Sequence, residues 1–503
     1  MKGMTAFETQ SGVFNDFRHL ARKSAVYGLG NLLLRGMNIF LLPLYTRYLT
    51  PADYGVMAVT ATVTAILGIL YPLGLHGAAT RLYFDAQDEL DGYQRIGTIW
   101  VGMILSAAVM AIFSDQIGDT VTPFFLRDVP FSPYIRLAIW TGFFSVFSLL
   151  PLNLFQILER PGLYVFASVG STLLTICLII GLVVFCGLGA YGYLLALLIT
   201  SALLAVAYAW VTLKYARVII RKHILKTALV YSLPLVPHGV ASWMMALSDR
   251  LILEHYVTLG QLGLYSLGYQ FGSVMNMAAT AINSAWVPFL FKLDAEQGET
   301  AKPRLARLVT YYALILSWVA LGLALLSKSL IFFLTPPAFH GAHNVIPWIT
   351  GGFLLGGFYL IPANYLFLKS KTVWIPLVTV FSGAINIGCN LLLVPHHGIM
   401  AAAWVNFLAN GVMLALVWAL TLRVYPFPYE YKRFGQIMLT ILGFFLLGNL
   451  VRFQSLPVET VVRGVMWLVY PFVLAGVGFF TDAEKEKALT FLKQALIALS
   501  RRA

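Results

Sequence analysis

The sequence predicts an all-α, polytopic membrane protein. Hydrophobic residues make up 59% of the 503 residues, charged residues make up 11%, and the mean hydropathy is +0.80. Soluble globular domains are typically ~45–50% apolar, so the chain is too apolar for that class. Windows of about 20 apolar residues recur along the sequence, each long enough to cross a bilayer core as a helix. Backbone groups inside a bilayer must pair within their own segment, which favours helices.

The expected spans, 14 in all, form two sets of six and a final pair. The first set covers 24–45, 54–78, 97–113, 134–155, 163–186 and 190–212. The second covers 228–250, 262–287, 308–327, 344–367, 373–394 and 399–422, and the pair covers 434–451 and 458–480. The predicted domains are a cytoplasmic segment (1–23), an N-lobe (24–212), a linker (213–227), a C-lobe (228–422), two further spans (434–480) and a tail (481–503).

The distribution of basic residues predicts the orientation of the chain. Of 34 Lys and Arg residues, 26 fall in one set of loops and 5 in the other. The positive-inside rule then places both termini and the linker in the cytoplasm. Residues 214–226 mix basic and aliphatic side chains and resemble an amphipathic helix on the anionic inner leaflet. The tail is also predicted to be amphipathic.

The first span carries a polar stripe. Tyr27, Asn31, Arg35 and Asn38 recur at helical spacing and share one face of a helix. Arg35 lies 11 residues past Ser24, which is roughly 16 Å deep and near the bilayer midplane. An arginine there costs at least ~2.5 kcal/mol unless water, a partner or a substrate solvates it. We therefore expect the stripe to line a cationic cavity that suits a phosphate or diphosphate.

A weak internal repeat links the first and seventh spans. At an offset of 203 residues, Arg47 aligns with Arg250 and Arg35 with His238. Past the span the offset becomes 208, and the Thr50–Gly55 segment aligns with Thr258–Gly263. Six spans separate the copies, so both halves have the same orientation, and a site between two lobes is expected.

Other polar residues inside expected spans are candidate cavity residues. They are His238, Ser242, Asn276 and Asn283, with Asp249 and Arg250 as a gate or ion pair. For any single asparagine, the alternative is a hydrogen bond between helices, worth ~0.6 kcal/mol on average. His238, between two helix breakers, could instead bond a freed backbone carbonyl. Arg250 and Glu254 have the spacing of a local ion pair.

The sequence offers no catalytic or cofactor motif. Cys177, Cys186 and Cys389 lie in apolar runs without metal-ligand spacing, and no Gly-rich phosphate loop or nucleophile elbow is present. The basic residues are dispersed among short loops, which argues against nucleic acid as a partner. We therefore expect no catalytic residue, no metal, no cofactor and no enzymatic activity.

Several motifs resemble those of Wzx-type polysaccharide flippases. They are KSAVYG (23–28), LPLYTRYLTPADYG (42–55), GLHGAATR (74–81), Asp249-Arg250 and Gly263-Leu264-Tyr265. The resemblance covers essentially the whole chain and places it in the MOP superfamily, with lipid II flippases and MATE multidrug exporters. It implies two pseudo-symmetric six-helix lobes in a V around a cavity, plus two C-terminal helices. It also implies that Arg35, with Arg81 at the cytoplasmic mouth, meets a lipid-linked diphosphate.

The predicted function is a flippase for an undecaprenyl-diphosphate-linked oligosaccharide. The glycan would be a repeat unit of O-antigen, capsule or exopolysaccharide, translocated by alternating access. Partners are expected to be this substrate, membrane lipids and other polysaccharide-assembly proteins. One alternative is a cation-coupled MATE exporter, which usually keeps buried acids in its first lobe. Another is a membrane glycosyltransferase or polymerase, against which the short outer loops argue.

Overall fold

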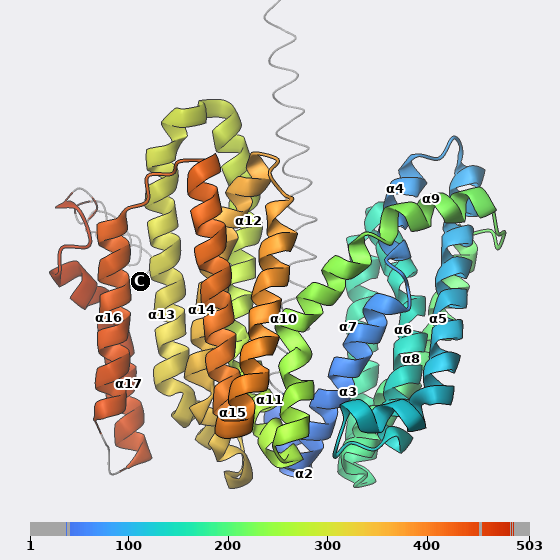
Figure 1. Cartoon of the computed structure of the whole chain (residues 1–503), viewed down its shortest axis with the longest axis horizontal. Helices are drawn as coiled ribbons and strands as arrows, with labels where there is room; N and C mark the ends of the chain where they lie inside the picture. Colours follow the sequence, from blue (N-terminus) through green and yellow to red (C-terminus); the bar gives the residue numbers. More distant parts are fainter. Residues whose placement is uncertain (1–36, 38–40, 452–454, 483, 485, 487–503) are drawn as a thin grey trace, which may run out of the picture. The chain divides into compact units, whose positions relative to one another are not determined.

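The computed structural model describes residues 37, 41–451, 455–482, 484 and 486. Every regular element among them is helical, which confirms the all-α prediction (Figure 1). Within this part of the chain, 10 helices are long and apolar enough to cross a membrane, or up to 11 if a bent pair counts as one. Most of span 24–45 lies outside the described residues, so the number 14 remains a prediction.

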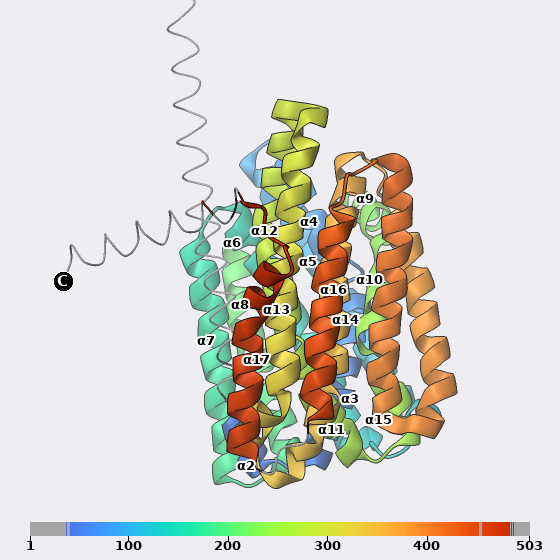
Figure 2. The same cartoon turned by 90° about the vertical axis from the view of Figure 1, so that its left-hand side faces the viewer.

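The chain divides into two compact units. The first comprises residues 1–266, 334–339 and 387–399, and the second comprises 267–333, 340–386 and 400–503. The helices of the first unit are α2 (Leu42–Tyr48), α3 (Pro51–Leu70), α4 (Leu75–Phe84), α5 (Glu89–Phe125), η1 (Phe131–Ile135), α6 (Arg136–Ile157), α7 (Pro161–Ile179), η2 (Ile180–Phe185), α8 (Gly189–Tyr215), α9 (Lys222–Ser232), α10 (Leu235–Tyr256) and the start of α11 (Leu259–Gly272). Within it, α6 packs along α8, with α7 beside both (Figure 2).

The Thr-Pro-Ala-Asp segment of the sequence motif forms a helix start. The Thr50 hydroxyl accepts a hydrogen bond from the Asp53 N–H at 3.2 Å, and the Asp53 carboxylate accepts one from the Thr50 N–H at 2.9 Å. This capping box satisfies donors that the first turn of α3 would leave unpaired. The second Asp53 oxygen accepts the Ala190 N–H at 3.0 Å, so the same residue also anchors the start of α8.

The two copies of the repeat meet in the first unit. Thr258 caps α11 as Thr50 caps α3, because its hydroxyl accepts the Gln261 N–H at 3.3 Å. A methyl group built on Gly55 would lie 2.2 Å from the carbonyl oxygen of Leu259, and one on Gly263 would lie 1.8 Å from that of Pro51. Pro51 and Leu259 are themselves equivalent at the offset of 208. The repeat therefore produces a reciprocal crossing in which each glycine lets the other helix approach its backbone.

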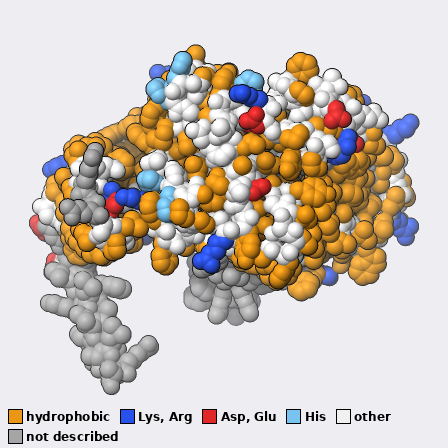
Figure 3. Space-filling view, turned by 90° about the horizontal axis from the view of Figure 1, so that it is seen from below, with side chains coloured by type: hydrophobic (Ala, Val, Ile, Leu, Met, Phe, Trp, Pro, Cys, Tyr) orange, Lys and Arg blue, Asp and Glu red, His pale blue; other side chains and the backbone are white. Residues whose placement is uncertain are grey.

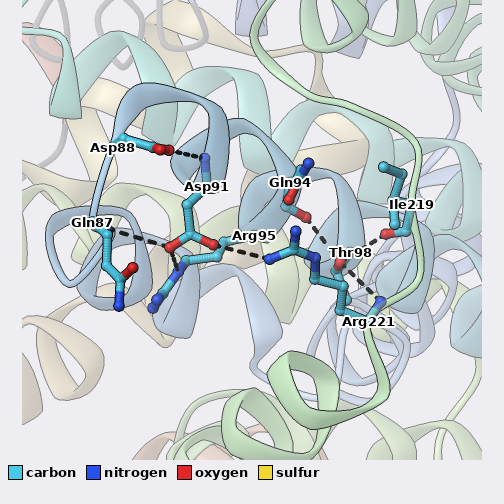
Figure 4. Close-up of polar contacts among 8 residues, drawn as sticks. All are labelled: Gln87, Asp88, Asp91, Gln94, Arg95, Thr98, Ile219 and Arg221. Carbon is cyan, nitrogen blue, oxygen red and sulfur yellow. Dashed lines mark hydrogen bonds and ion pairs between the residues drawn. The ribbon is translucent and has the colours of Figure 1, made fainter.

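The linker is only partly helical. Residues 216–221 are irregular, and α9 begins at Lys222. The Thr98 hydroxyl donates to the Ile219 carbonyl at 2.7 Å and accepts the Arg221 N–H at 3.3 Å (Figure 4). Asp91 holds the Arg221 guanidinium at 3.1 Å and that of Arg95 at 2.7 Å. Because α5 binds the linker backbone, a continuous helix over 214–226 does not form there.

The expected span 228–250 is interrupted. Helices α9 and α10 are bent by 41° at residues 233 and 234. Proline lacks an amide hydrogen and clashes with the preceding turn, so Pro234 explains why the helix breaks there. Downstream of the break, the Trp243 indole donates to the Thr62 carbonyl at 3.0 Å and ties α10 to α3.

The second unit is a helical bundle with its own core. Its helices are the end of α11, α12 (Val274–Gln297), η3 (Gly298–Ala301), α13 (Lys302–Leu334), η4 (Pro337–Asn344), α14 (Ile346–Leu368), α15 (Trp374–Val424), α16 (Tyr431–Leu450) and α17 (Leu456–Gly476), apart from segments 334–339 and 387–399. The long α15 covers two expected spans and turns at Gly398, whose φ of 56° favours glycine.

Helix α17 is fixed to α13 by paired polar contacts. The indoles of Trp318 and Trp467 stack, and each donates to the other's carbonyl, at 3.1 and 2.9 Å. Buried Glu459 accepts Lys328 at 2.6 Å and Arg463 at 3.0 Å. Both kinds of contact fasten α17 onto the second unit, as expected when polar groups must pair inside an apolar phase.

The outer surface of the long helices carries large apolar side chains, as contact with lipid requires. Large apolar side chains point outward on the long helices, including Phe166 (78% exposed), Phe185 (82%) and Phe333 (89%). Outward-facing apolar side chains along such long helices suit contact with lipid. The end of the molecule seen from below carries Lys, Arg, Asp, Glu and His side chains between hydrophobic ones (Figure 3).

Candidate functional site

The predicted first-span stripe falls outside the described residues. Tyr27, Asn31, Arg35 and Asn38 are all in this part of the chain. The remaining predicted residues divide between the units. Arg81, His238, Ser242, Asp249 and Arg250 belong to the first, whereas Asn276 and Asn283 belong to the second.

Arg81 lies in the last turns of α4 with an accessible guanidinium. Its side chain is 63% exposed and makes an i,i+4 contact of 3.7 Å with Asp85. The guanidinium also lies 5.2 Å from the ring centre of Tyr231 on α9, within the range of a cation–π contact. An exposed ion pair of this kind is weak, so the guanidinium can exchange Asp85 for an anionic ligand at little cost.

His238 and Ser242 form a small polar patch on α10. They are one helical turn apart, both are exposed, and the Ser242 hydroxyl donates to the His238 carbonyl at 3.0 Å. Gly239 and Trp243 on the neighbouring face contact Ile69 and Thr62 of α3. The contacts with α3 set the rotation of α10 and leave the His238 ring accessible.

Asp249 and Arg250 form a buried ion pair. Their side chains are 6% and 7% exposed and their charged groups are 2.8 Å apart. The Tyr265 hydroxyl of α11 also donates to Asp249, and the Arg250 guanidinium donates to the Ala246 carbonyl at 2.9 Å. The network is neutral and hydrogen-bonded, as a buried charge pair must be to be stable. It joins α10 to α11.

Glu254 has a role that the sequence does not predict. Its fully buried carboxylate accepts the backbone N–H groups of Arg127 at 2.8 Å, Asp128 at 2.6 Å and Val129 at 3.0 Å. These groups belong to the turn between α5 and η1. A backbone N–H has the same chemistry at every residue except proline, so no sequence signal could have identified this partner.

The second unit places polar side chains along α12. Asn276 is exposed, and the Thr280 hydroxyl donates to its carbonyl at 2.8 Å. Asn283 accepts a 2.7 Å hydrogen bond from the amide of Asn364 on α14. Asn283 therefore makes a hydrogen bond between helices, whereas the Asn276 side chain remains accessible.

These arrangements can bind polar and anionic groups. Among the described residues, no group of three or more His, Cys, Asp and Glu side chains is arranged to hold a metal ion. The accessible groups in the first unit are a guanidinium, an imidazole and a hydroxyl, which are suited to phosphate and sugar hydroxyls.

Comparison with known proteins identifies relatives of the chain. Residues 20–294 match the family described as "Polysaccharide biosynthesis protein". An "Uncharacterized membrane protein" of Haemophilus influenzae is 24% identical over 400 residues, which cover 76% of this chain and 94% of that protein. The "Lsg locus putative protein 1" of the same organism is 21% identical over 396 residues, with the same coverage.

Solved structures share the fold. The lipid II flippase MurJ, in an inward closed conformation, matches with a TM-score of 0.74 and 13% identity over 90% of this chain and 99% of that chain. An inward-facing MATE-family multidrug transporter of the MOP superfamily matches with a TM-score of 0.57 and 15% identity, over 77% of this chain and 93% of that chain. The chain therefore has the fold of MOP-superfamily transporters.

Proposed function

Because the chain belongs to the polysaccharide biosynthesis protein family, we propose that it is a flippase for an undecaprenyl-diphosphate-linked oligosaccharide. The family match over residues 20–294 carries the proposal. The similarity to a lipid II flippase supports a lipid-linked substrate. We further propose a bacterial cytoplasmic membrane, with both termini in the cytoplasm. In this proposal the protein transports its substrate and catalyses no covalent reaction.

The proposed substrate groups match the accessible side chains in their chemistry. Arg81, together with Arg35, would neutralise the diphosphate, because guanidinium groups bind phosphate oxygens in pairs. Sugar hydroxyls would bond the amides, hydroxyls and imidazole predicted from the sequence. These are Tyr27, Asn31, Asn38, His238, Ser242, Asn276 and Asn283, of which Asn283 also accepts the bond from Asn364.

Outward movement of the head group is electrically favourable. Each negative charge that leaves a negative-inside cell gains roughly 2.3 kcal/mol per 100 mV. A diphosphate carries two such charges. The membrane potential therefore assists export of this substrate, whereas it would oppose export of a cationic drug.

Arg81 gives the sharpest test within the described residues. Purified protein would be reconstituted in vesicles with a fluorescent undecaprenyl-diphosphate oligosaccharide, and the rate at which label reaches the opposite leaflet would be measured. Lys292 is a matched control, since it makes an equally exposed i,i+4 pair with Glu296 at 3.8 Å. We expect Arg81→Ala to slow transfer about tenfold or more and Lys292→Ala to leave it unchanged.

Four outcomes would contradict the proposal or part of it. Wild-type protein that does not accelerate transfer refutes the flippase activity itself. Equal transfer by both alanine variants refutes the role of Arg81 alone. Efflux of a cationic dye without lipid transfer would favour a drug exporter, and formation of a longer glycan by the purified protein would favour a glycosyltransferase or polymerase.

A further inference from the structure

One side of α9 carries a groove that the proposed function does not use. The groove has a volume of about 480 Å³, and the described residues that line it are two lysines and five apolar residues between Lys222 and Pro234. Helix α9 packs against α4 and α5 (Figure 1). Its other side is buried, since Ile224, Ala228 and Ser232 are at most 3% exposed. The packed side fixes the rotation of α9 and leaves the lysine side accessible.

The groove runs from the edge of a membrane span into it. Arg221, at the start of α9, contacts Asp91 in the first turn of α5 at 3.1 Å (Figure 4). A methyl group built on Gly102 of α5 would lie 2.7 Å from the Leu225 side chain. Gly102 is 11 residues past Asp91, which is roughly 16 Å along the helix. It belongs to the expected span 97–113, so α9 begins outside the apolar part of α5 and then enters it.

The outer end of the groove is positively charged. Lys222 and Lys226 are exposed, lie one helical turn apart, and pair with no carboxylate among the described residues. Residues 214–233 contain five Lys and Arg residues and no acid, and Asp91 is already shared between two guanidinium groups. Side chains lean toward the N-terminus of a helix, where the helix dipole is positive. This end of α9 therefore attracts an anion.

The inner end of the groove is apolar. Leu229, Val230 and Leu233 follow Lys226 at i+3, i+4 and i+7, so they continue the face that carries the lysines. Val230 is 68% exposed and Leu233 is 46% exposed. A soluble anion would leave these side chains without a partner, and a neutral lipid would leave two ammonium groups without one. An anionic phospholipid supplies both a phosphate and an acyl chain.

The groove is separate from the face of α9 that contacts Arg81. The Arg81 guanidinium lies 5.2 Å from the ring centre of Tyr231. Tyr231 is five residues past Lys226, and at about 100° per residue the two side chains point about 140° apart around the helix. A ligand in the groove therefore does not occupy the position proposed for the substrate diphosphate. This position favours a phospholipid of the surrounding bilayer over the transported lipid.

We propose that this groove binds an anionic phospholipid. Its phosphate contacts Lys222 and Lys226, and an acyl chain lies along Leu229, Val230 and Leu233. Basic pockets at the ends of membrane helices bind anionic headgroups by the same chemistry. The inference goes beyond the proposed function and does not depend on it, and only the choice of the inner leaflet rests on the proposed orientation.

The test measures lipid binding by the purified full chain in detergent. Delipidated protein would be titrated with phosphatidylglycerol, and bound lipid would be counted by native mass spectrometry, with thermal unfolding as a second readout. Phosphatidylcholine tests the need for negative charge, and glycerol 1-phosphate tests the need for an acyl chain. One double variant, Lys222→Gln with Lys226→Gln, removes the charges of the groove. The control, Lys371→Gln with Lys432→Gln, removes two exposed lysines that lie outside it.

Each lysine beside an anionic headgroup should raise affinity about fivefold, so the groove variant should bind phosphatidylglycerol about 25-fold more weakly than the wild type. The control should bind it as the wild type does. Both double variants should unfold at the wild-type temperature without lipid, because no ion pair of the groove is lost. The proposal is overturned if the two double variants bind phosphatidylglycerol equally well, or if phosphatidylcholine binds the wild type as tightly.

Two further outcomes would assign the groove to another ligand and so overturn the proposal. Glycerol 1-phosphate that raises the unfolding temperature as much as phosphatidylglycerol would indicate a site for phosphate alone. Undecaprenyl diphosphate that displaces phosphatidylglycerol at a lower concentration would indicate a site for the transported lipid. Neither result bears on the transfer assay with Arg81→Ala, so failure of the groove and failure of the proposed function are distinguishable.

Discussion

The reciprocal glycine crossing makes a quantitative prediction about stability. A Cβ at Gly55 would lie 2.2 Å from the Leu259 oxygen, and one at Gly263 would lie 1.8 Å from the Pro51 oxygen. Ordinary contacts begin at 3.4 Å. The two helices must therefore separate by more than an ångström to admit either methyl group. The obstacle in each case is a backbone atom, which cannot rotate away as a side chain can.

Overpacking of this size typically costs about 1–3 kcal/mol. We expect Gly55→Ala and Gly263→Ala each to lower the free energy of unfolding by that amount, less the helix propensity gained by alanine. Gly68 lies on the same helix as Gly55, and a methyl group added to it would meet nothing within 4 Å. Gly68→Ala should instead stabilise α3 by about 0.5–1 kcal/mol. If Gly55→Ala lowers stability and Gly68→Ala raises it, the loss at Gly55 comes from the helix crossing and not from alanine in α3 as such.

The double variant tests the geometry. One separation of α3 from α11 relieves both clashes, so Gly55→Ala with Gly263→Ala should cost less than the two single changes added together. Thermal or denaturant unfolding of purified protein in detergent would provide the comparison. Equal effects of Gly55→Ala and Gly68→Ala would refute the crossing, and strict additivity in the double variant would refute the shared separation.

Two further predictions concern buried or paired carboxylates. Glu254→Ala leaves the N–H groups of Arg127, Asp128 and Val129 without their acceptor. We therefore expect the free energy of unfolding to fall by about 3 kcal/mol and trypsin to cleave faster after Arg127. An unchanged rate of cleavage would contradict the anchoring role of Glu254. At Glu484, desolvation raises the carboxyl pKa, but hydrogen bonds from the Thr481 N–H and the Arg433 guanidinium outweigh it and lower the pKa to about 2. Its stabilising contribution is therefore full above the unfolded value of 4.5 and is lost as pH falls toward about 2. Glu484→Gln should remove this part of the pH dependence in thermal unfolding between about pH 5.5 and pH 3.5, and identical profiles for variant and wild type would contradict it.

Local features of the chain were readable from the sequence. Runs of about 20 apolar residues predicted membrane helices, because a bilayer requires that length wherever the run occurs. The Thr50–Gly55 segment stands out as part of the LPLYTRYLTPADYG motif, and it forms a capped helix start. The repeat of threonine and glycine was visible as a spacing, and the second threonine caps its helix as the first does. Helix caps depend on a few neighbouring residues, and membrane helices depend on the length of one apolar run. Both can therefore be predicted from the sequence alone.

Other features were decided only by tertiary structure. Glu254 has the spacing of an ion pair with Arg250, yet its carboxylate accepts three N–H groups more than 120 residues away. The linker pattern predicted a helix from 214, but bonds from Thr98 on α5 keep residues 216–221 irregular. Such contacts depend on which helix faces pack together and on backbone groups that are the same in nearly every residue. Sequence periodicity therefore predicts where helices form, but it does not predict which partners their polar atoms contact.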